Sequence, residues 1–138
     1  MAYISFEQIE KYYGSQHVLK NLSLSVDKGE FVTLLGPSGC GKSTLLRCLA
    51  GLESISSGRI LLDGEEITHV PPRQRNVGMI FQQYSLFPTM NVYNNIAFGL
   101  KIQGVSKEEA RLRIAEALKM ADLAGSENKY PSQLSGGE

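Results

Sequence analysis

The stretch "GPSGCGKST", Gly36 to Thr44, is the most informative part of this sequence. It matches the pattern G-x-x-x-x-G-K-[ST], in which a glycine-rich loop holds phosphate groups. The short apolar run before it, "FVTLL" at 31–35, predicts a strand that is covered on both faces. The leucines of "STLLRCLAG", 43–51, predict a helix that ends at Gly51. Strand, loop and helix predict half of a βαβ unit and therefore an α/β fold class.

The chemistry of phosphate binding explains the residue types in this loop. Glycines let backbone N–H groups curl around a phosphate, and the helix N-terminus adds its positive dipole end. Lys42 is expected to reach the β- and γ-phosphates, Ser43 to ligate Mg²⁺ and Thr44 to contact the α-phosphate. The predicted nucleotide-binding residues are Gly36, Pro37, Ser38, Gly39, Cys40, Gly41, Lys42, Ser43 and Thr44. The loop alone leaves kinases, GTPases and ATPases open.

Strand signals dominate the sequence around this loop. The alternation of polar and apolar residues in "NLSLSV", 21–26, predicts a half-buried strand, and "YISFEQI" near the start is a weaker strand signal. Asp63 and Gly64 in "GRILLDGEEI" predict the type I′ turn of a hairpin. "NVGMIF", 76–81, predicts a further strand.

The character of the sequence changes from Pro88 onward and becomes helical. Ser106 is expected to cap a helix, and Glu109 stands at the reciprocal position of a capping box. Gly125 is expected to end that helix. Its predicted apolar face consists of Ala110, Ile114, Ala117, Leu118 and Ala121.

Further stretches make the whole chain resemble the nucleotide-binding subunit of an ATP-binding cassette (ABC) transporter, most closely of bacterial importers. They are "KYYGS", "VGMIFQQYSLFP" and the final "LSGGE". The resemblance implies a P-loop NTPase fold with an N-terminal antiparallel β part and a helical subdomain, ending before the Walker B strand. It divides the chain into a β-rich nucleotide-binding core at 1–82 and a helical subdomain at 83–138.

The resemblance also assigns residues to the base and to the metal. In this family an aromatic ring before a glycine stacks on adenine, which falls on Tyr13 and less well on Tyr12. A glutamine after a buried strand reaches Mg²⁺ and the attacking water, which implies a catalytic and metal role for Gln82, with Gln83 as its neighbour. ATP and Mg²⁺ are therefore the implied cofactors, with Lys42 as the second catalytic residue.

The "LSGGE" stretch resembles the signature motif of the family, in which glutamine usually stands at the last position, here Glu138. In the family, two subunits pair head to tail, and each signature covers the γ-phosphate held by the other. Ser135 would then donate its hydroxyl in trans, and Gly136 and Gly137 their backbone N–H groups. The implied first partner is a second nucleotide-binding subunit.

The family carries its Mg²⁺ aspartate, its water-activating glutamate and its switch histidine after the signature. Asp63 in "ILLDGE" imitates the aspartate strand, but Gly64 makes it a turn, and we interpret His17 and His69 as surface residues. We therefore expect this 138-residue chain to be unable to hydrolyse ATP alone. We also expect bare strand edges at 31–35 and 77–81, so that the isolated chain folds poorly or aggregates.

The segment 84–100 is rich in aromatic and large apolar side chains. In the family this region accepts a short helix from a transmembrane permease subunit, which places Phe87 and Pro88 nearest the partner. The simpler interpretation is that these side chains build the core of the helical subdomain, and we expect both. A periplasmic or lipid-anchored solute receptor would be an indirect partner.

Composition limits the location and the partners. Fourteen basic residues balance fourteen acidic ones, so nothing attracts nucleic acid or anionic lipid in general. No signal peptide and no apolar run of the ~20 residues of a membrane helix is visible. Cys40 and Cys48 are expected to be free, buried thiols of a reducing cytosol. The expected location is peripheral, at the cytoplasmic face of the inner membrane.

The leading hypothesis is an importer subunit that couples ATP binding and hydrolysis to the uptake of a small polar solute. Polyamines, phosphonates, ferric iron and sugars stay open, because the partner subunits choose the solute. The alternatives are a truncated remnant or partial sequence, an ABC protein of DNA repair or translation, and, most distantly, a P-loop kinase.

Overall fold

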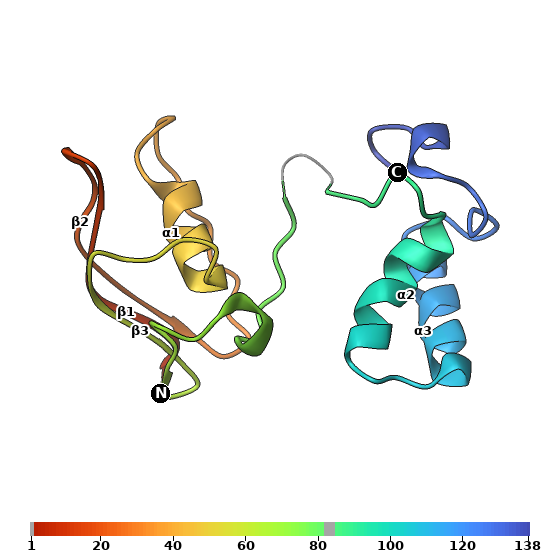
Figure 1. The fold of residues 1–138 in the computed structure, drawn as a ribbon, viewed down its shortest axis with the longest axis horizontal. Helices are drawn as coiled ribbons and strands as arrows, with labels where there is room; N and C mark the ends of the chain where they lie inside the picture. Colours follow the sequence, from red (N-terminus) through yellow and green to blue (C-terminus); the bar gives the residue numbers. More distant parts are fainter. Residues whose placement is uncertain (1, 82–84) are drawn as a thin grey trace. The chain divides into compact units, whose positions relative to one another are not determined.

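The computed structural model describes residues 2–81 and 85–138, which form two compact units, Met1–Met79 and Ile80–Glu138. The first unit contains the strands β1 (Ala2–Tyr13), β2 (Gln16–Asp27), β3 (Ser57–Leu62) and β4 (Glu65–Glu66), the helix α1 (Lys42–Ala50) and the 3-10 turn η1 (Pro72–Gln74). The second contains the helices α2 (Val92–Ile102) and α3 (Lys107–Met120) and the 3-10 turn η2 (Pro131–Gln133). Figure 1 shows these elements.

The strands of the first unit form one antiparallel sheet in the order β2-β1-β3-β4. The stretch at 21–26 lies within β2, and its side chains alternate between exposed and half-buried positions, as the sequence predicts. Asp63 and Gly64 join β3 to β4 with φ angles of 50° and 82°. Positive φ at both central residues is the requirement of a type I′ turn, so the predicted hairpin is confirmed.

The core of the first unit lies between this sheet and helix α1. Phe6, Ile9 and Ile60 of the sheet are buried together with Leu45 and Cys48 of the helix. Figure 1 shows α1 lying along one side of the sheet. This packing fixes the helix, and with it the loop that precedes it, against β1 and β2.

Helix α1 begins at Lys42 and ends at Gly51, whose φ of 76° gives the predicted left-handed stop. The predicted apolar face is only partly correct. Leu45 is buried and Leu49 half-buried, but Leu46 is exposed, and Cys48 takes its place in the core. A period of 3.6 residues brings 45 and 48 to the same face, whereas 46 lies about 100° away.

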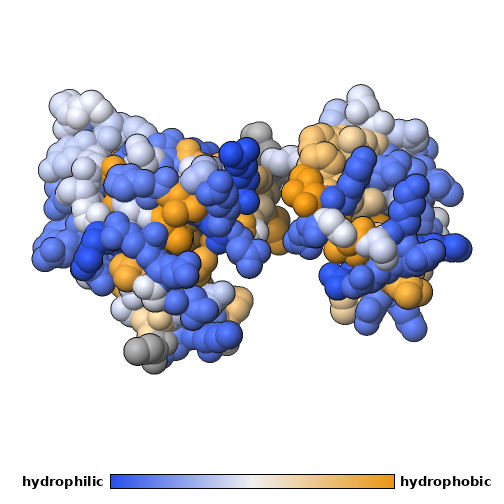
Figure 2. All heavy atoms as spheres, turned by 60° about the horizontal axis from the view of Figure 1, so that its bottom comes forward, coloured by the Kyte–Doolittle hydropathy of each residue, from blue (hydrophilic) through white to orange (hydrophobic). Residues whose placement is uncertain are grey.

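The predicted strands at 31–35 and 76–81 are not strands among the described residues. Phe31, Leu35 and Ile80 are 93%, 88% and 100% exposed. A strand forms only when its backbone groups pair with a neighbour, and the four-stranded sheet does not extend to either segment. The expected strand edges are therefore not formed at these segments, although their apolar side chains are exposed. Hydrophobic surface interrupts the mostly hydrophilic exterior (Figure 2).

The core of the second unit uses the apolar face that the sequence predicts for the helix after Ser106. Ala110, Ile114 and Leu118 of α3 are buried against Val92 of α2. The predicted face is thus confirmed at its centre, whereas Ala121 is exposed. Tyr93, Ile96, Ala97, Leu100, Val105, Leu123 and Leu134 complete the cluster as half-buried side chains.

The sequence predicts the start of α3 correctly but not its end. The Ser106 hydroxyl accepts from the Glu109 amide at 3.2 Å, as predicted, whereas the Glu109 carboxylate pairs with Arg113. The helix ends at Met120 and not at Gly125, because Asp122 adopts a positive φ of 57° and turns the chain. Asx residues tolerate this conformation better than other side chains do, which a search for glycine alone overlooks.

Candidate functional site

The glycine-rich loop leads directly into the N-terminus of α1. Gly41 adopts a φ of 97° immediately before the helix, and its carbonyl accepts the first helical hydrogen bond from Leu45 at 2.9 Å. The amides of the first helical turn have no acceptor within the helix and face the loop. No acidic residue stands in that turn, so the positive end of the helix dipole is not compensated there.

Lys42 occupies the interior of the loop in this structure. Its Nζ donates to the carbonyl oxygens of Gly36 and Pro37, both at 2.7 Å, and lies 3.3 Å from Sγ of Cys40. A further turn is closed by the Cys40 amide, which donates to Pro37 O at 3.4 Å. The loop therefore wraps around its own ammonium group, at the place where an anion would need a positive charge.

Gly41 also seats the loop against β2. A Cβ at this position would lie 2.8 Å from Cδ2 of Leu19 and 3.2 Å from the carbonyl oxygen of Val18. Because the backbone approaches β2 this closely and has a positive φ, only glycine fits without displacement. The loop is thus packed against β2, and position 41 requires glycine both for this close approach and for its positive φ.

A cavity of about 650 Å³ lies beside the loop. Its walls are residues 16–23 of the chain together with Gly39 and Cys40. The first wall residue, Gln16, pairs across the hairpin with Tyr13, the last residue of β1. The predicted base-stacking residue is therefore the strand partner of a residue that lines the cavity beside the loop.

The two tyrosines before Gly14 have different surroundings, although both are about two-fifths exposed. The Tyr12 ring is stacked on His17, with centroids 4.0 Å apart and planes 11° apart, and His17 in turn pairs with Glu10. The Tyr13 ring has Lys11 Nζ at 4.6 Å from its centroid. Tyr12 is thus already engaged by another ring, which favours Tyr13 for a nucleobase.

Sequence reasoning missed two cations that hold this unit together, Lys11 and Arg75. Arg75 is 4% exposed and donates to four carbonyl oxygens, those of Val70 at 2.6 Å, Cys48 at 2.7 Å, and Leu49 and Thr68 at 3.0 Å. Burial lowers the pKa of its guanidinium below the ordinary value, and the nearby Cys48 opposes this. No local pattern reveals such a role, because the acceptors lie up to 27 residues away.

The signature stretch forms a tight turn in the second unit. The Ser135 amide donates to the Glu138 carboxylate at 2.7 Å, and the Glu138 amide donates to Ser135 O at 3.1 Å. The Glu138 carboxylate also bonds to the Ser135 hydroxyl. The Ser135 amide first, and then this hydroxyl, hold the pKa of Glu138 below its ordinary value. The carboxylate thus engages the hydroxyl, the one donor of Ser135 that the family resemblance assigns to a phosphate.

The other residues considered for the site, including those rejected for it, lie in different places. Gln82, with Gln83, lies outside the described residues. Asp63 is in the hairpin turn and His69 is exposed, as expected, whereas His17 is half-buried in its pair with Glu10. Within 2–81 and 85–138, no group of three or more His, Cys, Asp or Glu side chains could hold a metal ion. A Mg²⁺ ion bound by a side-chain hydroxyl, a side-chain amide and phosphate oxygens would not require a cluster of this kind.

The two cysteines differ, which corrects the expectation that both are buried. Cys40 is exposed in the loop and Cys48 is buried in α1. Burial raises the pKa of the Cys48 thiol above its ordinary value, with Lys11 opposing the shift, so that less of it is thiolate at a given pH.

At about pH 8, iodoacetamide is expected to modify Cys40 of the native protein and to spare Cys48, because only an accessible thiolate reacts. Peptide mass spectrometry would measure both sites. Urea-unfolded protein is the control, in which both should react. Equal labelling of the two cysteines in the native protein would contradict the burial of Cys48.

A glycine-rich loop of the pattern G-x-x-x-x-G-K-[ST] that opens a helix defines the P-loop class of proteins, and residues 36–44 lead into α1 in this way. The sequence profile of the family described as "ABC transporter" matches residues 19–138, and the chain therefore belongs to the ABC transporter family.

Two similar proteins agree with this assignment. The chain is 52% identical over 135 residues to the spermidine/putrescine import ATP-binding protein PotA of Pasteurella multocida, covering 98% of this chain and 36% of that protein. It is 48% identical over 136 residues to the Fe(3+) ions import ATP-binding protein FbpC of Escherichia coli O157:H7, covering 99% and 39%. The chain thus spans between a third and two fifths of the length of these relatives.

Solved structures show the same fold. The dimeric structure of MJ0796, a bacterial ABC transporter cassette, matches with a TM-score of 0.86 at 34% identity, covering 96% of this chain and 63% of that one. A dimeric post-hydrolysis state of the same cassette with ADP and Pi matches with a TM-score of 0.85 at 33% identity. The predicted fold class, a P-loop ABC ATPase with an antiparallel β part and helices, is confirmed.

Proposed function

We propose that this chain is part of the ATP-binding subunit of an ABC importer, which couples ATP binding and hydrolysis to the uptake of a small polar solute. The observation that carries this proposal is the glycine-rich loop closed around Lys42 in a chain about 50% identical to import ATP-binding proteins. Catalysis and transport belong to the proposal for the whole protein, because the chain covers only part of these relatives.

In this proposal the loop residues 36–44 bind the triphosphate and Tyr13 stacks on the adenine. Lys42 exchanges its two carbonyl acceptors for phosphate oxygens, and the amides at the start of α1 donate to the same group. Ser43, exposed at the helix start, and Gln82 hold Mg²⁺. Residues 1–82 act as the nucleotide-binding core and 83–138 as the helical subdomain.

A second nucleotide-binding subunit completes the site in this proposal. Ser135, Gly136 and Gly137 of one copy bind the γ-phosphate held by the other. The dimeric structures of the similar cassette support such pairing. The Ser135 amide, which is not one of the donors assigned to the phosphate, is held by the Glu138 carboxylate within the same turn.

The surface of the second unit supports a permease as a further partner. An apolar groove of about 730 Å³ runs along α2 and α3, and Lys101 and Lys107 stand among its walls. Beside it, Phe87 packs on Phe98, with ring centroids 4.8 Å apart, and Asn95 fixes the Phe87 backbone through its amide and its carbonyl. A short helix with an apolar face and acidic flanks fits this chemistry.

No helix in the described parts of the chain has the length and the apolar character needed to cross a membrane. We propose peripheral attachment at the cytoplasmic face of the inner membrane, through permease subunits, with a periplasmic or lipid-anchored receptor as an indirect partner. The names of the relatives make polyamines and ferric iron the first solutes to test.

Deletion of the gene in its host tests this proposal. Uptake of at least one solute among radiolabelled polyamines, ferric iron, phosphonates and sugars should fall to background. The wild-type gene should restore that uptake, and a Lys42→Ala gene should not. Unchanged uptake of the whole panel, with a protein that still binds ATP, would favour an ABC role outside transport.

A further inference from the structure

We propose that Lys11 is a positioning residue that fixes the ring of Tyr13 for the nucleobase and links it to the segment that follows α1. This inference rests on the proposed ATP-binding function and deepens it, because it adds a determinant of base affinity that the phosphate loop does not supply. The juxtaposition that carries it is a buried ammonium group held between a tyrosine ring and a carboxylate.

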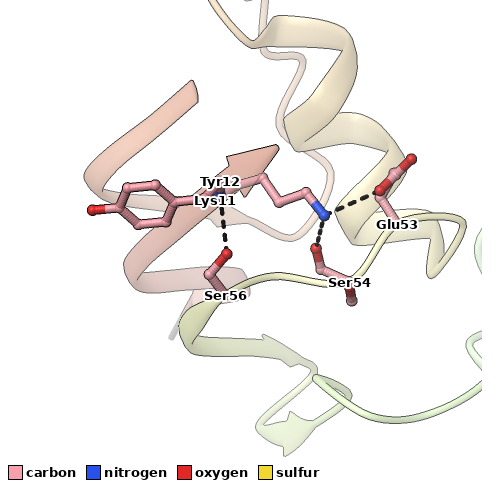
Figure 3. Close-up of polar contacts among 5 residues, drawn as sticks. All are labelled: Lys11, Tyr12, Glu53, Ser54 and Ser56. Carbon is pink, nitrogen blue, oxygen red and sulfur yellow. Dashed lines mark hydrogen bonds and ion pairs between the residues drawn. The ribbon is translucent and has the colours of Figure 1, made fainter. Parts of the chain in front are cut away.

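Strand geometry places Lys11 and Tyr13 on the same face of β1, since side chains two residues apart point the same way. The Lys11 Nζ lies 4.6 Å from the centre of the Tyr13 ring, within the range of a cation–π contact. Tyr12 points away from the Lys11 ammonium group, as Figure 3 shows, and its ring is stacked on His17. One cation therefore selects one of two adjacent tyrosines.

The ammonium group is fixed by its other contacts. Nζ donates to the carbonyl oxygen of Ser54 at 2.6 Å and pairs with the Glu53 carboxylate at 3.1 Å, as Figure 3 shows. Lys11 is only 6% exposed, and a buried charge keeps such partners because losing them is costly. Because these partners fix the ammonium group, the cation–π contact is most favourable in one orientation of the Tyr13 ring, the one that faces the ammonium group.

The same segment holds the end of β1 by its backbone. The Ser56 amide donates to Glu10 O at 2.7 Å, and the Tyr12 amide donates to the Ser56 hydroxyl at 3.0 Å. This segment is itself tied to α1, because the Leu52 amide donates to Arg47 O at 2.9 Å. Residues 52–56 therefore connect the strand that carries the base-stacking ring to the helix that carries the phosphate loop.

The test compares two probes on the intact protein, Mg·ATP and Mg·tripolyphosphate, which lacks the base and the sugar. Lys11→Met should weaken ATP binding about five- to tenfold, because the ring loses its fixed orientation, and change tripolyphosphate binding less than about twofold. The ratio of the two affinities in one sample does not depend on the fraction of protein that is folded. Lys11→Arg should retain the wild-type ratio, since guanidinium also binds aromatic faces.

A double-mutant cycle separates positioning from charge. In a Tyr13→Ala background, Lys11→Met should cause no further loss of ATP affinity. Lys28→Met is the matched control, because Lys28 Nζ lies over the Tyr3 ring at 5.7 Å, and it should leave both affinities unchanged. If Lys11→Met does not fold, Glu53→Gln, which loosens the same ammonium group, should shift the ratio in the same direction.

Two results would overturn the inference. Equal losses for ATP and tripolyphosphate would mean that Lys11 acts only by attracting phosphate. An additional loss in the Tyr13→Ala background would mean that it acts without the ring. Wild-type protein that binds neither probe would instead contradict the proposed function, so the two failures are distinguishable.

Discussion

Replacing Lys42 with alanine is expected to lower the affinity of the intact protein for Mg·ATP by about 100-fold. Charge-assisted hydrogen bonds contribute about 1.5–3 kcal/mol each and tenfold in affinity corresponds to about 1.4 kcal/mol, so two lost phosphate bonds give this size. The substitution also removes the cation that holds the carbonyl oxygens of Gly36 and Pro37 together. Isothermal titration calorimetry would measure the dissociation constant.

Lys119→Ala is the control for this measurement. Lys119 is exposed in the last turn of α3, and its substitution removes the same charge as Lys42→Ala. It should leave the affinity within about twofold of wild type, because screening weakens distant surface charges. Retention of wild-type ATP affinity by Lys42→Ala would remove the basis of the nucleotide site assigned here.

Arg75→Met is expected to lower the free energy of unfolding by about 3–5 kcal/mol, because it leaves several carbonyl oxygens without their charged donor. Two of these carbonyls, of Cys48 and Leu49, belong to the last turn of α1, where Arg75 supplies a charged donor to the helix end. The positive charge at this end also complements the helix dipole. The loss should appear in urea unfolding as a lower midpoint at an unchanged slope.

Arg73→Met provides a matched control from the same turn, since Arg73 is exposed in η1. Surface substitutions of this kind change stability by about 0.5 kcal/mol or less. An Arg75→Met midpoint equal to that of Arg73→Met would show that water satisfies the four carbonyls at little cost.

The parts of the fold that the sequence predicts are those with local causes. The loop at 36–44, the start of α1, the Asp63–Gly64 turn and the Ser106 cap each depend on residues within about one helical turn. The strands expected at 31–35 and 76–81 depend on pairing with distant chain segments, and apolar composition alone does not supply a partner.

The same division holds for the candidate site. The loop could be predicted because its motif is local, whereas Tyr13 is assigned through the family resemblance and stays a prediction. The contacts of Lys11 with Glu53 and of Arg75 with Cys48 could not, since 42 and 27 residues separate the partners. A lysine two residues before the tyrosine on a strand is the only local sign of the first contact.

The ammonium group of Lys42 acts as a placeholder in the glycine-rich loop. Because it bridges the carbonyl oxygens of Gly36 and Pro37, it holds the loop in a defined conformation. In the proposed function, a triphosphate would then bind to a preorganised loop. Each hydrogen bond from Lys42 to a phosphate would replace one to a carbonyl oxygen, so the net free energy of binding would be smaller than the contacts alone suggest. Under the proposed function, a loop built this way would exchange its ligand without having to refold.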